Sequence, residues 1–146
     1  MKKAEISNVL SALKKVRMPK ISDKEVRNAL IKNHLFLLGQ GKKYDEEIEK
    51  LRTVHLGSYE KELAEVQELQ FKMQQEQDAE KKQKMVEEIN SHTDLLQAIN
   101  SFNKAVYDLG EEKIEISKIN GEKFAEEYGE QDYDPAVVEA LYVMFE

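Results

Sequence analysis

The middle of the chain carries a nearly continuous heptad-like spacing of mainly apolar and aromatic residues, and this feature constrains the fold more than any other. Steps of three and four residues keep side chains on one face of an α-helix, so the stretch predicts a long helix. Consecutive steps of four between Leu51 and Leu63 form a stutter that contains Gly57, and we expect the helix to bend there without a true loop. The positions of this first arm are Tyr44, Ile48, Leu51, His55, Tyr59, Leu63, Val66, Gln70 and Met73.

A second arm follows a polar stretch at residues 76–84, which contains no aliphatic side chain larger than alanine and suits an exposed turn. At 1.5 Å per residue, each arm of about 30 residues would reach about 45 Å. The wide apolar face of the second arm consists of Met85, Ile89, His92, Leu95, Leu96, Ile99, Phe102, Asn103, Val106 and Leu109. The two arms predict an antiparallel helical hairpin. Its expected core or interface residues are Leu63, Val66, Met73, Leu96, Ile99, Phe102 and Val106.

Two amphipathic helices are expected before the hairpin. Apolar residues recur at helical spacing over residues 6–16, and Met18-Pro19 ends this helix because the residue before a proline is pushed out of the α region. Ser22, with Glu25 three residues later, forms a capping-box pattern that predicts the start of the second helix.

The second helix becomes strongly apolar near its end. Residues 35–38 read Leu-Phe-Leu-Leu, and we expect this run to be largely buried. Gly39-Gln40-Gly41 then predicts a helix stop, because glycine is common just beyond helix C-termini.

The pattern changes after Gly110. Ile114, Ile116 and Ile119 predict a short strand near residues 113–119, ahead of the turn signal Asn120-Gly121. A lone strand cannot satisfy its own backbone groups, so we expect it to pair with an extended piece around residues 18–21 or with a second subunit.

A final helix is expected to close the core. Phe124 and Tyr128 predict a short helical turn, and Asp134-Pro135 predicts the N-cap and first position of the next helix. Leu141 and Phe145 share a face of that helix and should dock against the base of the hairpin. The predicted fold is therefore mainly α, a long antiparallel hairpin on a small helical base. We expect a single domain over residues 1–146, comprising a basic head at 1–43, the hairpin at 44–109 and an acidic segment at 110–146.

Composition excludes several classes of site. No cysteine is present, so the chain has no disulfide, thiolate zinc site or cysteine nucleophile. No segment approaches the roughly 18 apolar residues that a membrane span requires, and the first residues contain no signal-like apolar run. We expect a cytoplasmic protein without membrane contact.

The net charge of −7 conceals an opposition between the two ends of the chain. Residues 1–43 carry eleven Lys and Arg against three acidic residues, whereas residues 108–146 carry three lysines against twelve. We expect the basic head to be solvated or to dock on this acidic tail. The alternative is that the head binds nucleic-acid phosphates. The residues that would do so are Lys14, Lys15, Arg17, Lys20, Lys24 and Arg27.

No local motif predicts catalysis. Residues 39–43 read Gly-Gln-Gly-Lys-Lys, which lacks the first glycine and the final Ser or Thr of a phosphate-binding loop. His34, His55 and His92 are scattered and do not form a metal-binding pattern. Carboxylates are so abundant that two of them close together carry no catalytic signal. We therefore expect that the protein is not an enzyme and that it has no catalytic residues, no metal-binding residues and no cofactor.

The order of features resembles a family of short uncharacterised bacteriophage and prophage proteins. The matching features are an opening helix with Asn8-Val9-Leu10-Ser11-Ala12-Leu13, the charged helical residues 44–109, the stretch Glu112-Lys113-Ile114-Glu115-Ile116 with Ile119, and the apolar end from Val137 to Phe145. The resemblance implies a phage or prophage setting, and it transfers no functional residues.

The function predicted from sequence is a non-enzymatic interaction or assembly protein. Its helical hairpin would bind a protein partner or a second copy of the chain, because long apolar lines on helices are typical of such surfaces. The alternative is a nucleic-acid-binding regulator that uses the basic N-terminal helices.

Overall fold

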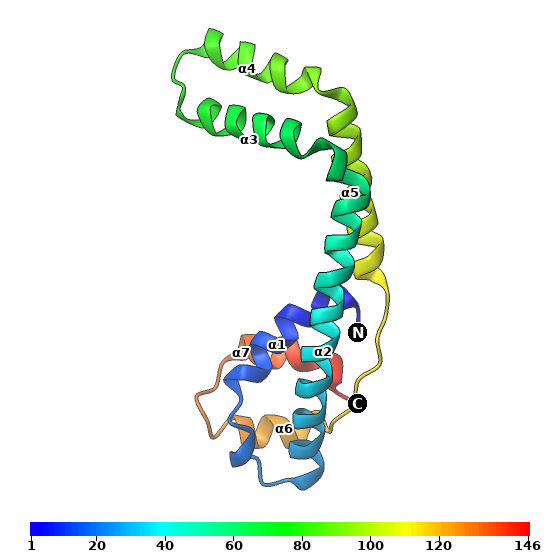
Figure 1. Cartoon of the computed structure of the whole chain (residues 1–146). Coiled ribbons are helices and arrows are strands. Elements are labelled where there is room, and N and C mark those ends of the chain that lie inside the picture. Colours follow the sequence, from blue (N-terminus) through cyan, green and yellow to red (C-terminus); the bar gives the residue numbers. More distant parts are fainter. The chain divides into compact units, whose positions relative to one another are not determined.

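The computed structural model describes all of residues 1–146 and is mainly α, as predicted. Of four 3-10 turns, two lie between helices and two lie outside the first and last helices, and no sheet is formed. The α-helices are α1 (Ile6–Lys15), α2 (Lys24–Leu56), α3 (Glu60–Gln75), α4 (Ala79–Ser91), α5 (Thr93–Glu111), α6 (Gly121–Tyr128) and α7 (Pro135–Leu141) (Figure 1). The 3-10 turns are η1 (Lys3–Glu5), η2 (Met18–Lys20), η3 (Gly57–Tyr59) and η4 (Tyr142–Met144).

The chain divides into two compact units. Unit 1 contains Met1–Glu46 together with Asp108–Glu146, and unit 2 contains Glu47–Tyr107. The basic head and the acidic C-terminal segment, which we expected as separate parts of one domain, therefore fold together as unit 1. None of the helices combines the length and the apolar composition needed to cross a lipid bilayer.

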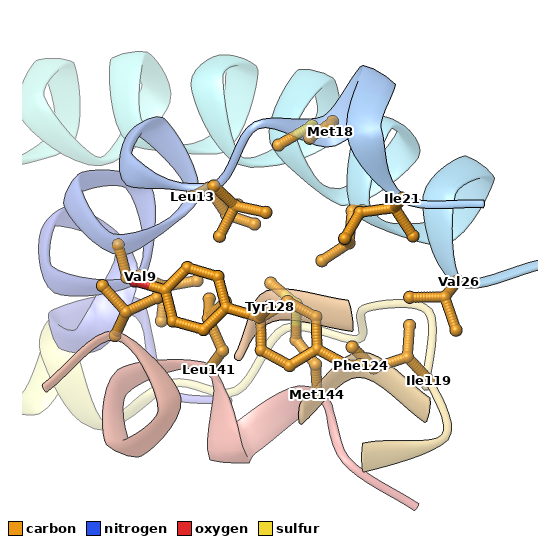
Figure 2. Close-up of a cluster of buried hydrophobic side chains, with 14 of the residues drawn as sticks. Val9, Leu13, Met18, Ile21, Val26, Ile119, Phe124, Tyr128, Leu141 and Met144 are labelled. Carbon is orange, nitrogen blue, oxygen red and sulfur yellow. The ribbon is translucent and has the colours of Figure 1, made fainter. Parts of the chain in front are cut away.

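The core of unit 1 lies between α1, the first half of α2, α6 and α7. Phe124 and Tyr128 stack at its centre with ring centroids 5.4 Å apart, and Leu141 and Met144 are fully buried beside them (Figure 2). The C-terminal helix packs within one chain, as predicted, but its main partner is α1 and not the base of the hairpin. Asp134 caps α7 by accepting a hydrogen bond from the Ala136 N–H at 3.0 Å, as predicted.

The predicted start of α2 is wrong by one residue. Asp23, and not Ser22, accepts the hydrogen bond from the Val26 N–H, at 3.0 Å. Ser22 instead donates its hydroxyl to the Glu127 carboxylate, which also accepts the Ser22 and Asp23 N–H groups. Because Ser22 bonds to Glu127, which is far away in sequence, Ser22 does not cap α2 as predicted.

The predicted helix stop at Gly39-Gln40-Gly41 is also wrong, because α2 continues through it to Leu56. No glycine has positive φ, so neither of these glycines acts as a left-handed cap. A Cβ on Gly41 would lie 3.3 Å from Ile6 Cγ2 and 3.7 Å from Leu10 Cδ1. Gly41 therefore allows α1 to approach α2 closely.

The predicted strand near residues 113–119 is an extended segment without a sheet. Its ends form isolated bridges, Lys2 with Lys113 and Ile119 with Phe145. The Ile114 N–H donates to the Met1 carbonyl at 2.8 Å. The expected pairing with residues 18–21 does not occur, because Met18–Lys20 forms the 3-10 turn η2.

Unit 2 is built on the predicted hairpin. α3 and α4 pack side by side, joined by a tip of only three residues at 76–78, and Asp78 caps α4 (Figure 1). Each predicted continuous arm is, however, two helices. The first is interrupted by η3 at Gly57, where the stutter and a poor helix former coincide. The second is interrupted at His92, where the Ser91 hydroxyl donates back to the Glu88 carbonyl and competes with helical bonding.

Candidate interaction surface

The acidic tail occupies part of the basic head, as the charge pattern predicted. Lys15 Nζ lies 3.4 Å from an Asp134 carboxylate oxygen, and Gln131 bonds to both backbone groups of Arg17. Arg27 donates to the Ile21 carbonyl at 2.9 Å. Of the six cations of the nucleic-acid hypothesis, Lys15 and Arg27 thus have partners within unit 1.

Two carboxylates at the contact between the basic head and the acidic tail have a lowered pKa. The Ser22 hydroxyl, together with the Ser22 and Asp23 N–H groups, lowers the pKa of Glu127 from its ordinary 4.5. The Val26 N–H and the nearby Lys123 lower the pKa of Asp23 from its ordinary 3.8. Both shifts arise from hydrogen bonds that favour the charged form, which is the expected result when a carboxylate accepts several donors.

The other four cations of the hypothesis, Lys14, Arg17, Lys20 and Lys24, are exposed and form no ion pair within the chain. Lys14 is on α1, Arg17 and Lys20 surround Pro19, and Lys24 begins α2. These side chains remain free to contact a partner.

An exposed apolar strip also lies on α2. Ile31, Leu35 and Leu38 are four and three residues apart, so they share one face of the helix, and they are 41%, 67% and 46% exposed. We call these three residues the α2 strip. Lys24 and Lys42 continue the same face at seven residues before and four residues after it.

The expectation that residues 35–38 are largely buried is therefore wrong for most of the run. Only Leu37 is fully buried, while Phe36 is 40% exposed on another side of α2. The reason is geometric. α1 and the C-terminal segment cover one face of α2, on which Val26, Leu30 and Leu37 lie, and four consecutive residues of a helix cannot all point to one face.

Residues of α1 line two shallow hollows, and Leu38 of the α2 strip lines the first of them. The first, of about 440 Å³, is lined by residues of α1 and α2 that include Leu10, Lys14, Leu38 and Lys42. The second, of about 490 Å³, is lined by Lys14, Arg17, Lys20 and His34 with apolar neighbours. Lys14 contributes to both, so the hollows adjoin each other.

Together these features make one surface. We call it the basic apolar face, and it consists of the α2 strip, the two hollows and five cations, Lys14, Arg17, Lys20, Lys24 and Lys42. Asp45 is the one acidic residue that lines either hollow. The arrangement can bury apolar side chains and attract negative charge.

The hairpin residues predicted as core or interface lie in unit 2. Val66 is buried with Ile89 and Leu95 at the centre of a small core. Leu63, Met73 and Ile99 pack against that core, while Leu96, Phe102 and Val106 are half-buried. Arg52 lies over the Phe102 ring, 5.5 Å from its centroid. The two predicted residues outside the hairpin, Leu141 and Phe145, belong to the core of unit 1.

The histidines are dispersed in the structure as in the sequence. His92, which lies between α4 and α5, places its Nδ1 3.5 Å from a Glu62 carboxylate oxygen of α3, and His34 lines the second hollow. No three or more His, Asp or Glu side chains gather as a metal site would require.

Comparison of the chain with protein-family models, with curated proteins and with solved structures finds no match. The resemblance to phage and prophage proteins stays a prediction. The α2 strip was not predicted as a candidate surface because its residues carry the same apolar signal as a buried helix face. The length of the apolar run could have indicated this surface. Residues 35–38 are four consecutive apolar residues, and one buried face of a helix cannot include all four.

Proposed function

We propose that the chain is a non-enzymatic interaction protein that docks a partner protein on the basic apolar face of unit 1. The observation that carries the proposal is the α2 strip itself. Its three aliphatic side chains are 41–67% exposed and lie on one helical face, and exposed apolar patches bordered by polar groups are typical of protein-binding sites.

The proposed docking surface lies on unit 1, whereas the sequence predicted that the hairpin would bind the partner. The apolar lines of the hairpin are used largely within unit 2, because Val66, Ile89 and Leu95 bury one another. The exposed large hydrophobic residues of unit 2, Val54, Phe71 and Tyr107, lie on three different helices and form no strip along one helix. The head therefore offers the better docking surface.

A photocrosslinking amino acid at position 35 tests this function in the cells that make the protein. A discrete protein adduct is expected from position 35 and not from position 54, where Val54 is 77% exposed on the same helix. The adduct should also disappear when Lys14 and Lys42 are both replaced by glutamate. Equal labelling from both positions, or no protein adduct from position 35, would argue against a docking function.

Nucleic-acid binding is the second candidate, and the observation in its favour is the set of four unpaired cations, Lys14, Arg17, Lys20 and Lys24. Phosphate contacts lose affinity steeply as salt rises, so a gel shift that weakens with salt and with Arg17→Glu would support it. The α2 strip weighs against it, because an aliphatic strip offers neither stacking nor hydrogen bonding to a nucleic acid.

A further inference from the structure

The charge of the basic apolar face selects its partner. Five exposed cations belong to this face, and Asp45 is the one carboxylate lining either hollow. Complementary potentials across an interface favour docking, and like charges oppose it. In a symmetric dimer the same patch meets itself. Two copies joined through this face would bring the lysines together, so a second copy is disfavoured and an acidic partner is favoured.

The shape of the surface selects the conformation of the partner. Unit 1 has only isolated bridges, at Lys2–Lys113 and Ile119–Phe145, so it offers no sheet edge to which a strand could add. Tyr44 is the only Phe, Tyr or Trp that lines either hollow, whereas a polyproline groove is lined by several aromatic side chains. A row of side chains one turn apart, with a hollow beside Leu38, is instead a surface against which a second helix packs, ridge into groove.

Given the proposed docking function, on which this inference rests, we infer that the partner segment is an acidic amphipathic helix lying along α2. Its apolar residues, three and four positions apart, contact Ile31, Leu35 and Leu38. Its Asp and Glu side chains flank that line and face Lys14, Lys24 and Lys42. A bilayer surface is the alternative occupant that the test below includes, because helices with an aliphatic face beside lysines also bind anionic membranes.

The test uses the full chain and a fluorescein-labelled synthetic peptide of about four helical turns, with Leu spaced four and three residues apart and Glu on both sides. Fluorescence anisotropy should show saturable binding that weakens with salt. A scrambled peptide of the same composition, which separates the leucines, should bind at least roughly tenfold more weakly, because its apolar contacts are lost.

Variants of the chain test the apolar strip and the cations of the surface separately. Leu35→Ser should weaken peptide binding roughly tenfold, and Val54→Ser, on the same helix, should leave it unchanged. Lys24→Glu with Lys42→Glu should weaken binding and reverse its salt dependence. Circular dichroism of each variant establishes that the fold is retained; all four positions are exposed.

Three results would overturn the inference: equal binding of both peptides, parental affinity of Leu35→Ser, or tighter binding of duplex DNA or phosphatidylserine vesicles than of the peptide. The peptide test examines the acidic helix and the crosslinking test examines the docking function, so the failure of one can be told from the failure of the other. If position 35 crosslinks a protein but the peptide does not bind, the docking function stands and the acidic helix is wrong. If neither occurs, both are wrong.

Discussion

The side-chain amide of Asn33 forms two hydrogen bonds with the backbone of Ser117, a residue 84 positions later in the chain. Its Nδ2 donates to the Ser117 carbonyl at 2.8 Å, and its Oδ1 accepts from the Ser117 N–H at 2.8 Å. Asn33 is 1% exposed on α2 and is the one polar residue in the core. The amide thus replaces the strand partner that the extended segment lacks.

Asn33→Ala should strongly destabilise unit 1. It leaves the N–H and carbonyl of Ser117 without partners, and each orphaned group costs roughly 1–3 kcal/mol. Urea unfolding followed by circular dichroism measures the loss. Asn28→Ala, at an exposed position of the same helix, is the control and should change little. An unchanged midpoint for Asn33→Ala would mean that water or a shifted backbone satisfies Ser117.

Acid should destabilise unit 1 through Glu127 and Asp23. Both have a pKa below the ordinary value because hydrogen bonds favour their charged forms. A group with a lowered folded-state pKa contributes stability that is present above its unfolded value and is lost as pH falls through the folded value. The stability should therefore fall below about pH 4.5, the ordinary glutamate value.

Glu127→Gln should flatten this acid dependence, because the neutral amide does not titrate. Near-UV circular dichroism of the tyrosines, one of which is the buried Tyr128, follows the unfolding. Glu126→Gln, at an exposed position of α6, should keep the parental profile. If Glu127→Gln showed the same acid loss as the parent chain, the contact with Ser22 would not control it.

Leu141→Ala should lower the melting temperature sharply. Leu141 is fully buried in the core of unit 1, and truncating such a residue costs roughly 2–5 kcal/mol. Phe145→Ala should also destabilise, since its ring lies 5.8 Å from that of Phe124, while Lys82→Ala on the exposed part of α4 should have almost no effect. Parental melting of both core variants with loss of self-association would indicate a contact between chains.

Gly57→Ala should stabilise the chain by up to about 1 kcal/mol. The added Cβ would meet only Thr53 Cγ2, at an ordinary contact distance of 3.8 Å, and Gly57 does not have positive φ. Gly41→Ala is the comparison, because its Cβ would lie 3.3 Å from Ile6 Cγ2 and its gain should be smaller or reversed. A thermal melt in which Gly57→Ala is markedly destabilised would contradict the prediction.

Local signals in the sequence determined the helical class and most helix positions. The first helix was expected over residues 6–16 and occupies Ile6–Lys15, and Asp134-Pro135 begins α7 as predicted. These features depend on residues within one or two turns, namely apolar spacing, a capping side chain and the fixed φ of proline. No partner from elsewhere in the chain is needed to specify them.

Only the tertiary structure decided which face of α2 is covered and what its glycines do. A glycine weakens a helix by about 1 kcal/mol, and packing of α1 against Gly41 can offset that cost, so the helix continues. The exposure of Leu35 and the pairing of Asn33 with Ser117 depend on segments far away in sequence. Periodicity shows that a face is apolar, but whether it becomes core or docking surface depends on how many such faces the rest of the chain can cover.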